Sequence, residues 1–305
     1  MTNSMQVLAR RAHPTSETQR IAPMADAARE LLAGRYELQD RIGHAGMAEL
    51  FTARDRKLGR IVVIKRPRRG DAGDVALADR LQREAIALAM IDSPHVVAIH
   101  DVGNTPRGMY LVLQHLPGRT LDEIIADHGP VAPERACRIA RDILTGLSAI
   151  HTAGLVHRDL KPSNVLVGLG DRAVLYDLGS ALHPRKRLPT DPDTAALGDH
   201  PPVDPVTGDG RTDLFQVGLI LILLVTGTMA WRAVDPEKLG VAPELRDVIC
   251  RALAPVEMRF GNALEMRRAI DHAIASSTRA TSMRAPTHLP PRRITLRWSG
   301  PLPRP

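Results

Sequence analysis

Short apolar runs separated by polar turns fill residues 36–113 and predict a β-rich unit. Five such runs span residues 36–42, 49–54, 61–65, 96–100 and 109–113. Each has the length and the aliphatic content typical of a strand. A longer segment, residues 74–91, interrupts them with an apolar stripe at helical spacing. Glu84 lies on that stripe, where a carboxylate is costly unless a cation pairs with it.

Helical periodicity dominates the second part of the chain. Residues 133–151 begin with a proline and repeat isoleucine and leucine at helical spacing, which predicts a long helix. Residues 214–226 are apolar almost all round, so we expect a helix at the centre of a core. Two amphipathic helices are expected at residues 245–253 and 263–274, and a short hairpin at residues 165–176.

The composition is that of a soluble globular protein. The 305 residues are 44% hydrophobic and 25% charged, and the low aromatic content of 3% predicts an aliphatic core. Cys137 and Cys250 lie far apart in sequence, which favours a reducing, cytoplasmic location over a disulfide framework or a zinc site. No secretory signal opens the chain, and its longest apolar run, residues 217–225, is far shorter than the ~20 residues of a membrane span.

The net charge of +7 belongs mainly to one end of the chain. Residues 276–305 contain six arginines and no acidic residue, which leaves +1 for residues 1–275. We expect residues 275–305 to be a basic, Pro-rich, disordered tail that is a candidate contact for acidic partners, with no specific nucleic-acid partner. Residues 1–34 are expected to be a mobile leader with one short helical piece at 25–32.

The strongest chemical signal is residues 157–164, His-Arg-Asp-Leu-Lys-Pro-Ser-Asn. Asp159 is placed to accept a hydroxyl proton, Lys161 to hold the charge of a migrating phosphate, and Asn164 to offer a neutral oxygen to magnesium. The alternative is a polar loop that spells this string by chance. With five specified positions at fixed spacing, the segment resembles the catalytic loop of protein kinases.

The resemblance covers residues 36–274 and implies the two-lobe α+β fold of protein kinases. A small β-rich N-lobe would span residues 35–113 and a larger helical C-lobe residues 114–274. The glycine turn at residues 43–46 and the position of Lys161 look most like those of bacterial, eukaryotic-like Ser/Thr kinases. Asp159 and Lys161 would then be the catalytic residues.

The resemblance also implies an ATP site. The glycine turn would bring backbone N–H groups to the phosphates, and Lys65 would bind them while paired with Glu84. Leu113 would close the back of the adenine pocket, ahead of a hinge at residues 114–116. The expected ATP-binding residues are Ile42, Gly43, His44, Ala45, Gly46, Met47, Ala48, Glu49, Leu50, Val63, Lys65, Glu84, Leu113, Gln114, His115, Leu116 and Leu166.

Asp177 begins Asp-Leu-Gly, which is similar to the D-F-G element of kinases. Asn164 and Asp177 are therefore expected to hold Mg²⁺, with Mn²⁺ as a substitute. A buried aspartate that caps a turn is the structural alternative. Residues 180–212 correspond to the activation segment, in which Ser180 is a weaker candidate phosphosite. The expected regulatory or structural residues are His157, Arg158, Gly179, Thr190, Thr194 and Asp213.

Specific roles follow from the resemblance for these residues. Arg158 is the type of residue that captures a phosphorylated loop side chain, and Thr190 and Thr194 are the main candidate phosphosites. Asp213, at the start of the expected central helix, would hold the backbone of the catalytic loop. His157 is expected to hold the same loop by hydrogen bonds.

Some positions depart from the kinase pattern. Ala45 replaces a usual glycine near the phosphates, and Val63 replaces a small residue above adenine. Each would weaken ATP binding by ~1–3 kcal/mol if the site does not relax. Asp199 stands where Ser/Thr kinases place a threonine, and its carboxylate could repel Asp159 or compete for Lys161.

The substrate-docking parts also depart from the pattern. Pro205-Val206 is the nearest match to A-P-E and lacks the glutamate that pairs with the position of Arg259. Residues 207–211 and 228–241 are short compared with the family. Nucleotide chemistry is therefore better preserved than substrate recognition.

Three functions fit these patterns. We expect a Ser/Thr protein kinase that uses Mg·ATP, acts on protein substrates and phosphorylates its own activation segment. The first alternative is a pseudokinase, a nucleotide-gated binding module without turnover, favoured by Ala45, Val63, Asp199 and Val206. The second is a kinase of small molecules such as antibiotics, against which the position of Lys161 and the glycine loop argue.

Overall fold

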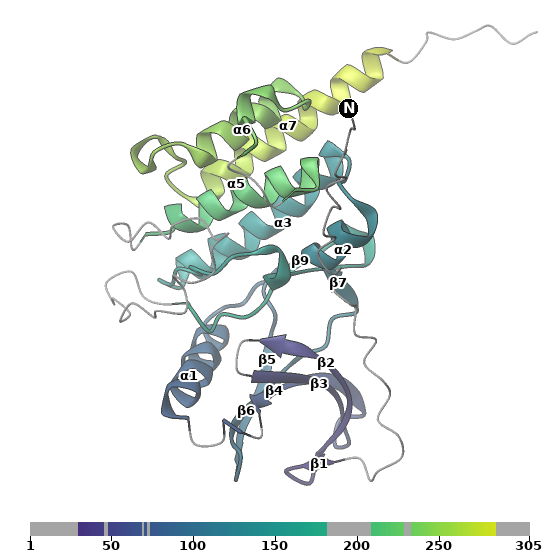
Figure 1. Ribbon diagram of the computed structural model, residues 1–305, viewed down its shortest axis with the longest axis vertical. Helices are drawn as coiled ribbons and strands as arrows, with labels where there is room; N and C mark the ends of the chain where they lie inside the picture. Colours follow the sequence, from purple (N-terminus) through teal and green to yellow (C-terminus); the bar gives the residue numbers. More distant parts are fainter. Residues whose placement is uncertain are drawn as a thin grey trace, which may run out of the picture.

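Two lobes, a curled sheet and a larger helical body, make up the chain (Figure 1). The computed structural model describes residues 30–45, 48–68, 70–71, 74–181, 209–228 and 233–284. Within them, no helix combines the length and the apolar character needed to cross a membrane.

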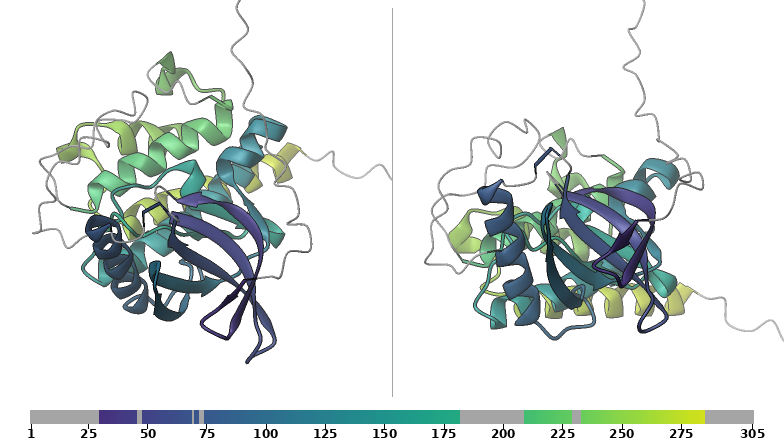
Figure 2. Two further views of the ribbon diagram at one scale, coloured as in Figure 1. Left: turned by 60° about the horizontal axis from the view of Figure 1, so that its bottom comes forward. Right: turned by 90° about the horizontal axis from the view of Figure 1, so that it is seen from below.

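The N-lobe is a six-stranded antiparallel sheet with the order β1-β2-β3-β4-β6-β5. Its strands are β1 (Leu31–Leu32), β2 (Tyr36–Ala45), β3 (Ala48–Asp55), β4 (Arg60–Pro67), β5 (Ile99–Thr105) and β6 (Gly108–Gln114). Helix α1 (Val75–Ala89) lies beside the sheet in both views of Figure 2. The Asp74 carboxylate accepts hydrogen bonds from the N–H groups of Ala76 and Leu77 and so caps this helix.

The described part of the C-lobe combines a small sheet with five helices. The sheet contains β7 (Gly118–Thr120), β8 (Val165–Gly168) and β9 (Ala173–Leu175). The helices are α2 (Leu121–His128), α3 (Pro133–Thr152), α5 (Arg211–Thr226), α6 (Pro243–Leu253) and α7 (Ala263–Arg284). Short 3-10 turns cover Pro162–Asn164, Leu169–Asp171, Pro236–Lys238 and Val256–Met258. Helix α3 packs against α5 and α7, so the long helices share one core.

Side-chain alternation along β4 separates a packing face from a functional face. Val62 and Ile64 are fully buried in an N-lobe core with Tyr36 and Phe51. Val63 and Lys65 point to the opposite face, because successive strand residues alternate between the faces of a sheet. That face is covered by α1 and the C-lobe, so one strand both anchors the sheet and presents a lysine to the space between the lobes.

The N-terminal boundary differs from the sequence prediction. Residues 31–32, expected at the end of a helical piece in a leader, form strand β1, which pairs with β2. The sheet therefore has six strands, where the sequence predicted five. Glu30 also contacts the N-lobe, since its carboxylate accepts two hydrogen bonds from Arg66, at 2.7 and 3.0 Å. A two-residue strand has no periodicity of its own, so only its partner reveals it.

Three further predictions of element positions need correction. The run at residues 96–100 enters the sheet only at Ile99, because Val96 and Val97 pair with Leu175 of the C-lobe. Helix α2 was not predicted, although Thr120 and Glu123 form a capping box at its start. Helix α7 continues through residue 284, beyond the predicted end of the domain at 274. No proline interrupts it before Pro286.

Candidate active site

Lys65 is the centre of a buried cluster that joins the two lobes. Its Nζ donates to Glu84 Oε2 at 2.6 Å, to Glu84 Oε1 at 2.8 Å and to Asp177 Oδ1 at 2.8 Å. Lys65 comes from β4, Glu84 from α1, and Asp177 from the turn after β9, and all three are buried. The free-energy cost of burying the Glu84 carboxylate on the apolar stripe of α1 is therefore offset by its direct ion pair with Lys65.

The electrostatics of the cluster favour full ionisation of Lys65 and Asp177. Burial opposes the charge of Lys65, but the neighbouring carboxylates of Glu84 and Asp177 outweigh it and raise the pKa of Lys65. Burial likewise opposes the charge of Asp177, but Lys65 outweighs it and holds the pKa of that carboxyl well below its usual range. The site therefore keeps an anionic oxygen at Asp177 over the physiological pH range.

The catalytic loop brings Asp159, Lys161 and Asn164 together. Lys161 Nζ donates to Asp159 Oδ2 at 2.9 Å. Asn164 Nδ2 donates to the backbone oxygen of Asp159 at 2.8 Å and lies 3.4 Å from Asp159 Oδ2. The carboxylate of Asp159 is thus oriented by two neighbours while remaining partly exposed to solvent. A partly exposed, oriented carboxylate is suited to accept a proton from an incoming hydroxyl.

Asp213 fixes the backbone of this loop from the first turn of α5. Its fully buried carboxylate accepts hydrogen bonds from the N–H groups of His157, at 2.9 Å, and Arg158, at 2.8 Å. His151 Nε2 lies 2.8 Å from the same carboxylate. Burial alone would raise the pKa of Asp213, but the contact with His151, reinforced by His157 and the backbone, holds it below its ordinary value. The predicted role of Asp213 toward the loop agrees with this geometry.

Two residues of the site adopt the left-handed backbone conformation. Arg158 has φ of 67° and Asp177 has φ of 63°. Such conformations are uncommon for residues other than glycine and persist where the surrounding contacts impose them. Here the contacts are Asp213, which binds the N–H of Arg158, and Lys65, which binds the carboxylate of Asp177.

The strand register assembles the predicted nucleotide-binding face. Val63 is paired with Leu113 of β6, and Lys65 is paired with Leu50 of β3. Directly paired residues of antiparallel strands share a face, so these side chains line the same surface as the lysine. The backbone N–H of Gln114 already donates to Ala98 O at 2.8 Å, so a nucleotide would need other hinge groups.

The remaining predicted ATP-binding residues occupy the expected elements. Ile42, Gly43, His44 and Ala45 end β2, Ala48 and Glu49 begin β3, Leu166 lies in β8, and His115 and Leu116 link β6 to β7. Gly46 and Met47 lie outside the described residues, as do Thr190, Thr194, Asp199 and Val206.

The amide oxygen of Asn164 and the carboxylate of Asp177 suit a divalent cation. Asn164 uses its Nδ2 to hold Asp159, which leaves its amide oxygen as an acceptor, and Asp177 uses Oδ1 for Lys65 and for the N–H of Gly179. A carboxylate together with an amide oxygen fits a hard cation that takes its other ligands from phosphate and water. Within the part of the chain that the structure describes, no cluster of three or more His, Cys, Asp or Glu side chains offers a metal site.

His157 hydrogen-bonds to hold the loop through its backbone, not through its ring. The side chain is fully buried, and neither ring nitrogen has a hydrogen-bond partner among the described residues. The loop is held instead by the backbone N–H of His157, through Asp213. The ring therefore acts as packing.

Several residues of the site were not identified from the sequence. Gln216 accepts a hydrogen bond from the N–H of Leu160 at 3.2 Å and donates to Arg158 O at 3.0 Å. The sequence did offer a signal for Gln216, because it is a polar residue in an otherwise apolar helical segment. His151 gave no such signal, because its partner Asp213 lies 62 residues away. Tyr176 donates from its hydroxyl to Ser163 O at 2.5 Å and so ties the end of β9 to the catalytic loop.

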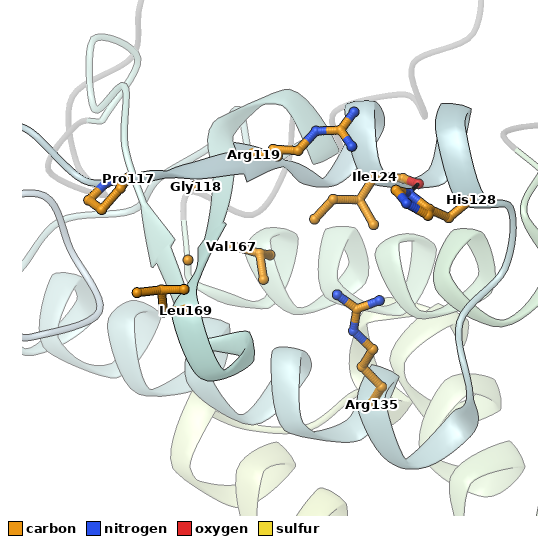
Figure 3. A pocket seen from close by; sticks show the side chains of 9 residues that line it. Pro117, Gly118, Arg119, Ile124, His128, Arg135, Val167 and Leu169 are labelled. Carbon is orange, nitrogen blue, oxygen red and sulfur yellow. Dashed lines mark hydrogen bonds between the residues drawn. The ribbon is translucent and has the colours of Figure 1, made fainter.

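A cavity of about 440 Å³ lies on the C-lobe, away from this site. Figure 3 shows its lining, with Arg119 and Arg135 on opposite sides of Ile124. Arg119 is paired with Asp127 at 2.6 Å and Arg135 with Asp171 at 2.9 Å. The lining includes none of the predicted catalytic, metal-binding or ATP-binding residues.

Comparisons with known proteins agree with this geometry. A family model described as the protein kinase domain matches residues 36–262. The serine/threonine-protein kinase PknB of Mycolicibacterium smegmatis is 33% identical over 264 residues, which cover 77% of this chain and 42% of PknB. PknD of Mycobacterium tuberculosis is 32% identical over 251 residues, which cover 79% of this chain and 36% of PknD. The chain thus spans less than half the length of these relatives.

A solved structure shows the same architecture. The crystal structure of the Mycobacterium tuberculosis PknI kinase domain is 26% identical in sequence and aligns with a TM-score of 0.60. The alignment covers 82% of this chain and all of the PknI domain. Together with the family match and the cluster around Lys65, these similarities establish the relationship. The chain belongs to the protein kinase family and is a bacterial, eukaryotic-like member of it.

Proposed function

We propose that this chain is a Ser/Thr protein kinase that transfers the γ-phosphate of ATP to hydroxyl groups of protein substrates. The observation that supports it most is the Lys65 cluster, in which one ammonium binds Glu84 and Asp177 from different lobes. This arrangement places the lysine, the helix and the metal-binding turn in mutual contact, as phosphoryl transfer by kinases requires.

The residues of the catalytic loop have separate tasks in this proposal. Asp159 orients the substrate hydroxyl and accepts its proton, while Lys161, 2.9 Å away, stabilises the charge that develops on the transferred group. Asp213 holds the backbone on which both depend. Mg²⁺, held by Asn164 and Asp177, would supply charge neutralisation on the phosphates; Mn²⁺ would suit the same oxygen ligands.

The nucleotide would bind between the glycine turn and β8. Lys65 binds its phosphates, Val63 and Leu166 contact adenine from the two lobes, and Leu113 limits the depth of the pocket. The pairing of Val63 with Leu113 supports an adenine end that is narrow and aliphatic. Tight adenine binding therefore depends on small adjustments of these side chains.

The organisation around this core is also a proposal. The kinase domain would extend from Glu30 to the end of α7 rather than from residue 35 to 274, because β1 and the whole of α7 have regular structure. Autophosphorylation at Thr190 or Thr194 would be sensed by Arg158. Cys137 and Cys250 are both free thiols, which supports a reducing compartment such as the cytoplasm, and the basic tail remains a candidate contact for acidic partners.

Intact-mass spectrometry after incubation with Mg·ATP tests the activity. The wild-type chain and the Asp159→Asn variant are each incubated with casein as an added acceptor and then compared. We expect phosphate on serine or threonine of the wild type or of casein, and transfer at least ~10²-fold slower in the variant, because the general base is lost. Full activity of Asp159→Asn would refute the assigned role.

Nucleotide binding is measured in parallel by thermal shift. ATP that raises the melting temperature without any transfer to the chain or to casein would favour the pseudokinase, for which Val63 and Ala45 are the supporting residues. Phosphate that appears only on an aminoglycoside antibiotic would favour a small-molecule kinase. If the mass spectra of wild type and Asp159→Asn are identical after incubation with Mg·ATP, and ATP does not change the melting temperature, the protein-kinase and small-molecule-kinase functions are both rejected.

A further inference from the structure

Arg80 links helix α1 to the metal-binding turn by a second route, independent of Lys65. It lies one helical turn before Glu84, on the same side of α1. Its Nη2 lies 3.5 Å from Ser180 Oγ, a long hydrogen bond between residues that are 100 positions apart. Arg80 therefore reaches from the N-lobe to the segment that directly follows Asp177-Leu178-Gly179.

Arg80 also lies next to Gly179. A Cβ atom at residue 179 would lie 2.6 Å from Arg80 Nε and 3.2 Å from Arg80 Cγ. Part of the arginine side chain therefore occupies the space that a side chain at position 179 would need. The φ angle of Gly179 is in the range that other residues adopt, so the backbone conformation is no reason for a glycine here. The space taken by Arg80 is the reason that the structure offers.

Arg80 also balances the charge of the cluster. Its guanidinium adds a positive charge near Glu84 and Asp177, the two carboxylates bound to Lys65. Two cations thus face two carboxylates in a largely buried space. Without Arg80, the cluster would lose one positive charge, and the turn would lose its contact with α1 through Ser180.

We propose that Arg80 is a positioning residue that holds the Asp177–Gly179 turn against α1, so that the chain binds a metal–nucleotide complex in preference to the nucleotide alone. Gly179 lacks a side chain to admit this contact. The proposal rests on the proposed kinase function, because the turn matters through the metal that Asp177 would bind.

Calorimetric binding of a non-hydrolysable ATP analogue, with Mg²⁺ and with EDTA, tests the proposal in the 305-residue chain. We expect Arg80→Ala to weaken binding of the magnesium complex about tenfold and to change binding of the metal-free analogue less than about twofold. Arg80→Lys is expected to recover part of the loss, since it keeps the charge but not the flat guanidinium. Arg83→Ala, on the same helix, is the matched control, because Arg83 forms none of the hydrogen bonds or ion pairs of the cluster.

A double-mutant cycle isolates the contact between Arg80 and Gly179. Gly179→Ala is expected to weaken binding of the magnesium complex in the wild-type background and to have little further effect beside Arg80→Ala. Additive effects would show that the two residues act separately, and would overturn the proposal. Equal losses with Mg²⁺ and with EDTA would also overturn it, because they indicate a general effect on lobe packing.

The outcomes separate this proposal from the proposed function. If the wild type binds the magnesium complex more tightly than the metal-free analogue but transfers no phosphate, kinase turnover is refuted while the role of Arg80 is still measured. If the wild type transfers phosphate and Arg80→Ala binds the magnesium complex normally, only the role of Arg80 is refuted. A wild type that binds no nucleotide refutes both.

Discussion

Two lysine–carboxylate pairs in this protein have the same chemistry and opposite surroundings. Lys65 and Glu84 meet at 2.6 Å with side chains that are 4% and 1% exposed. Lys161 and Asp159 meet at 2.9 Å with side chains that are 31% and 30% exposed. The first pair is enclosed between α1, β4 and the C-lobe, whereas the second lies on a loop that faces solvent.

The difference in burial determines what each pair contributes. The buried pair matters for stability, and the exposed pair is accessible for chemistry. In the buried pair, each charge depends on its partner, since an unpaired buried ion costs several kcal/mol. In the partly exposed pair, water solvates either charge when the other is removed, so the pair adds little stability. The exposed pair is therefore the one that an incoming group can approach from solvent. The buried pair joins β4 to α1 within the N-lobe, and the contact of Lys65 with Asp177 links both to the C-lobe.

The buried pair gives the largest predicted effect. Lys65→Met leaves Glu84 and Asp177 without their shared cation, so we expect a loss of ~3–5 kcal/mol in the free energy of unfolding. Phosphate transfer is expected to fall by at least ~10²-fold, because a cation that binds the phosphates is lost. Urea unfolding and the mass-spectrometric assay measure the two effects on the same preparation.

Lys238→Met is the matched control for this variant. Lys238 pairs with Asp235 at 2.8 Å, but its side chain is 83% exposed. We expect the control to unfold at the same urea concentration as the wild type, because an exposed ion pair adds little stability. If Lys65→Met were no less stable than Lys238→Met, burial would not distinguish the pairs, and the comparison would fail.

Acid titration of Asp213 is expected to change the free energy of unfolding by an intermediate amount. The carboxylate of Asp213 holds the backbone of the loop that carries the exposed pair. Its folded-state pKa is lowered relative to an unfolded value of ~3.9. Its ionisation therefore contributes stability that is fully present above about pH 4–5 and is lost as the pH falls toward the folded-state pKa. We expect Asp213→Asn to cost ~1–3 kcal/mol at pH 7, because buried N–H groups lose a charged acceptor, and to cost progressively less between pH 5 and pH 3.

Urea unfolding at each pH measures this difference. Asp177 and Asp55 also have lowered pKa values, and Arg35 lowers the pKa of Asp55 to about 2. Both carboxyls titrate in wild type and in variant, so their contributions cancel in the difference between the two. Asp271→Asn, a change at an exposed position on α7, controls for the loss of one carboxylate. A cost of Asp213→Asn that stays constant from pH 7 to pH 3 would contradict the lowered pKa.

The two pairs also differ in how far the sequence predicts them. Asp159 and Lys161 are two residues apart, so a short motif contains their whole geometry. Lys65 is 19 residues from Glu84 and 112 from Asp177, and only the fold brings them together. The sequence could still suggest the first of these contacts, because Glu84 on an apolar stripe requires a cation.

Features without a local signal were predicted wrongly or not at all. Strand β1 depends on pairing with β2, and the pairing of Val96 and Val97 with Leu175 depends on how the lobes meet. The positive φ angles of Arg158 and Asp177 come from distant contacts, which no residue type at those positions indicates. In contrast, the periodic helix α3 was predicted almost to its ends, because its apolar face is set by its own sequence.

The exposed pair gives the smallest predicted change in stability. Asp159→Asn removes the ion pair with Lys161, but both side chains remain in contact with water, so we expect a loss below ~1 kcal/mol. The hydrogen bond from Asn164 goes mainly to the backbone oxygen of Asp159, which the substitution leaves in place. Asp213 and Gln216 also hold main-chain groups of the loop.

Urea unfolding of wild type, Asp159→Asn and Lys65→Met in one series therefore sharpens the comparison. Both variants should lose phosphate transfer, yet only Lys65→Met should unfold at markedly lower urea. A loss above ~2 kcal/mol in Asp159→Asn would mean that the loop needs its ion pair to fold. Catalysis and stability would then rest on the same residues in both pairs, and solvent exposure would no longer separate them.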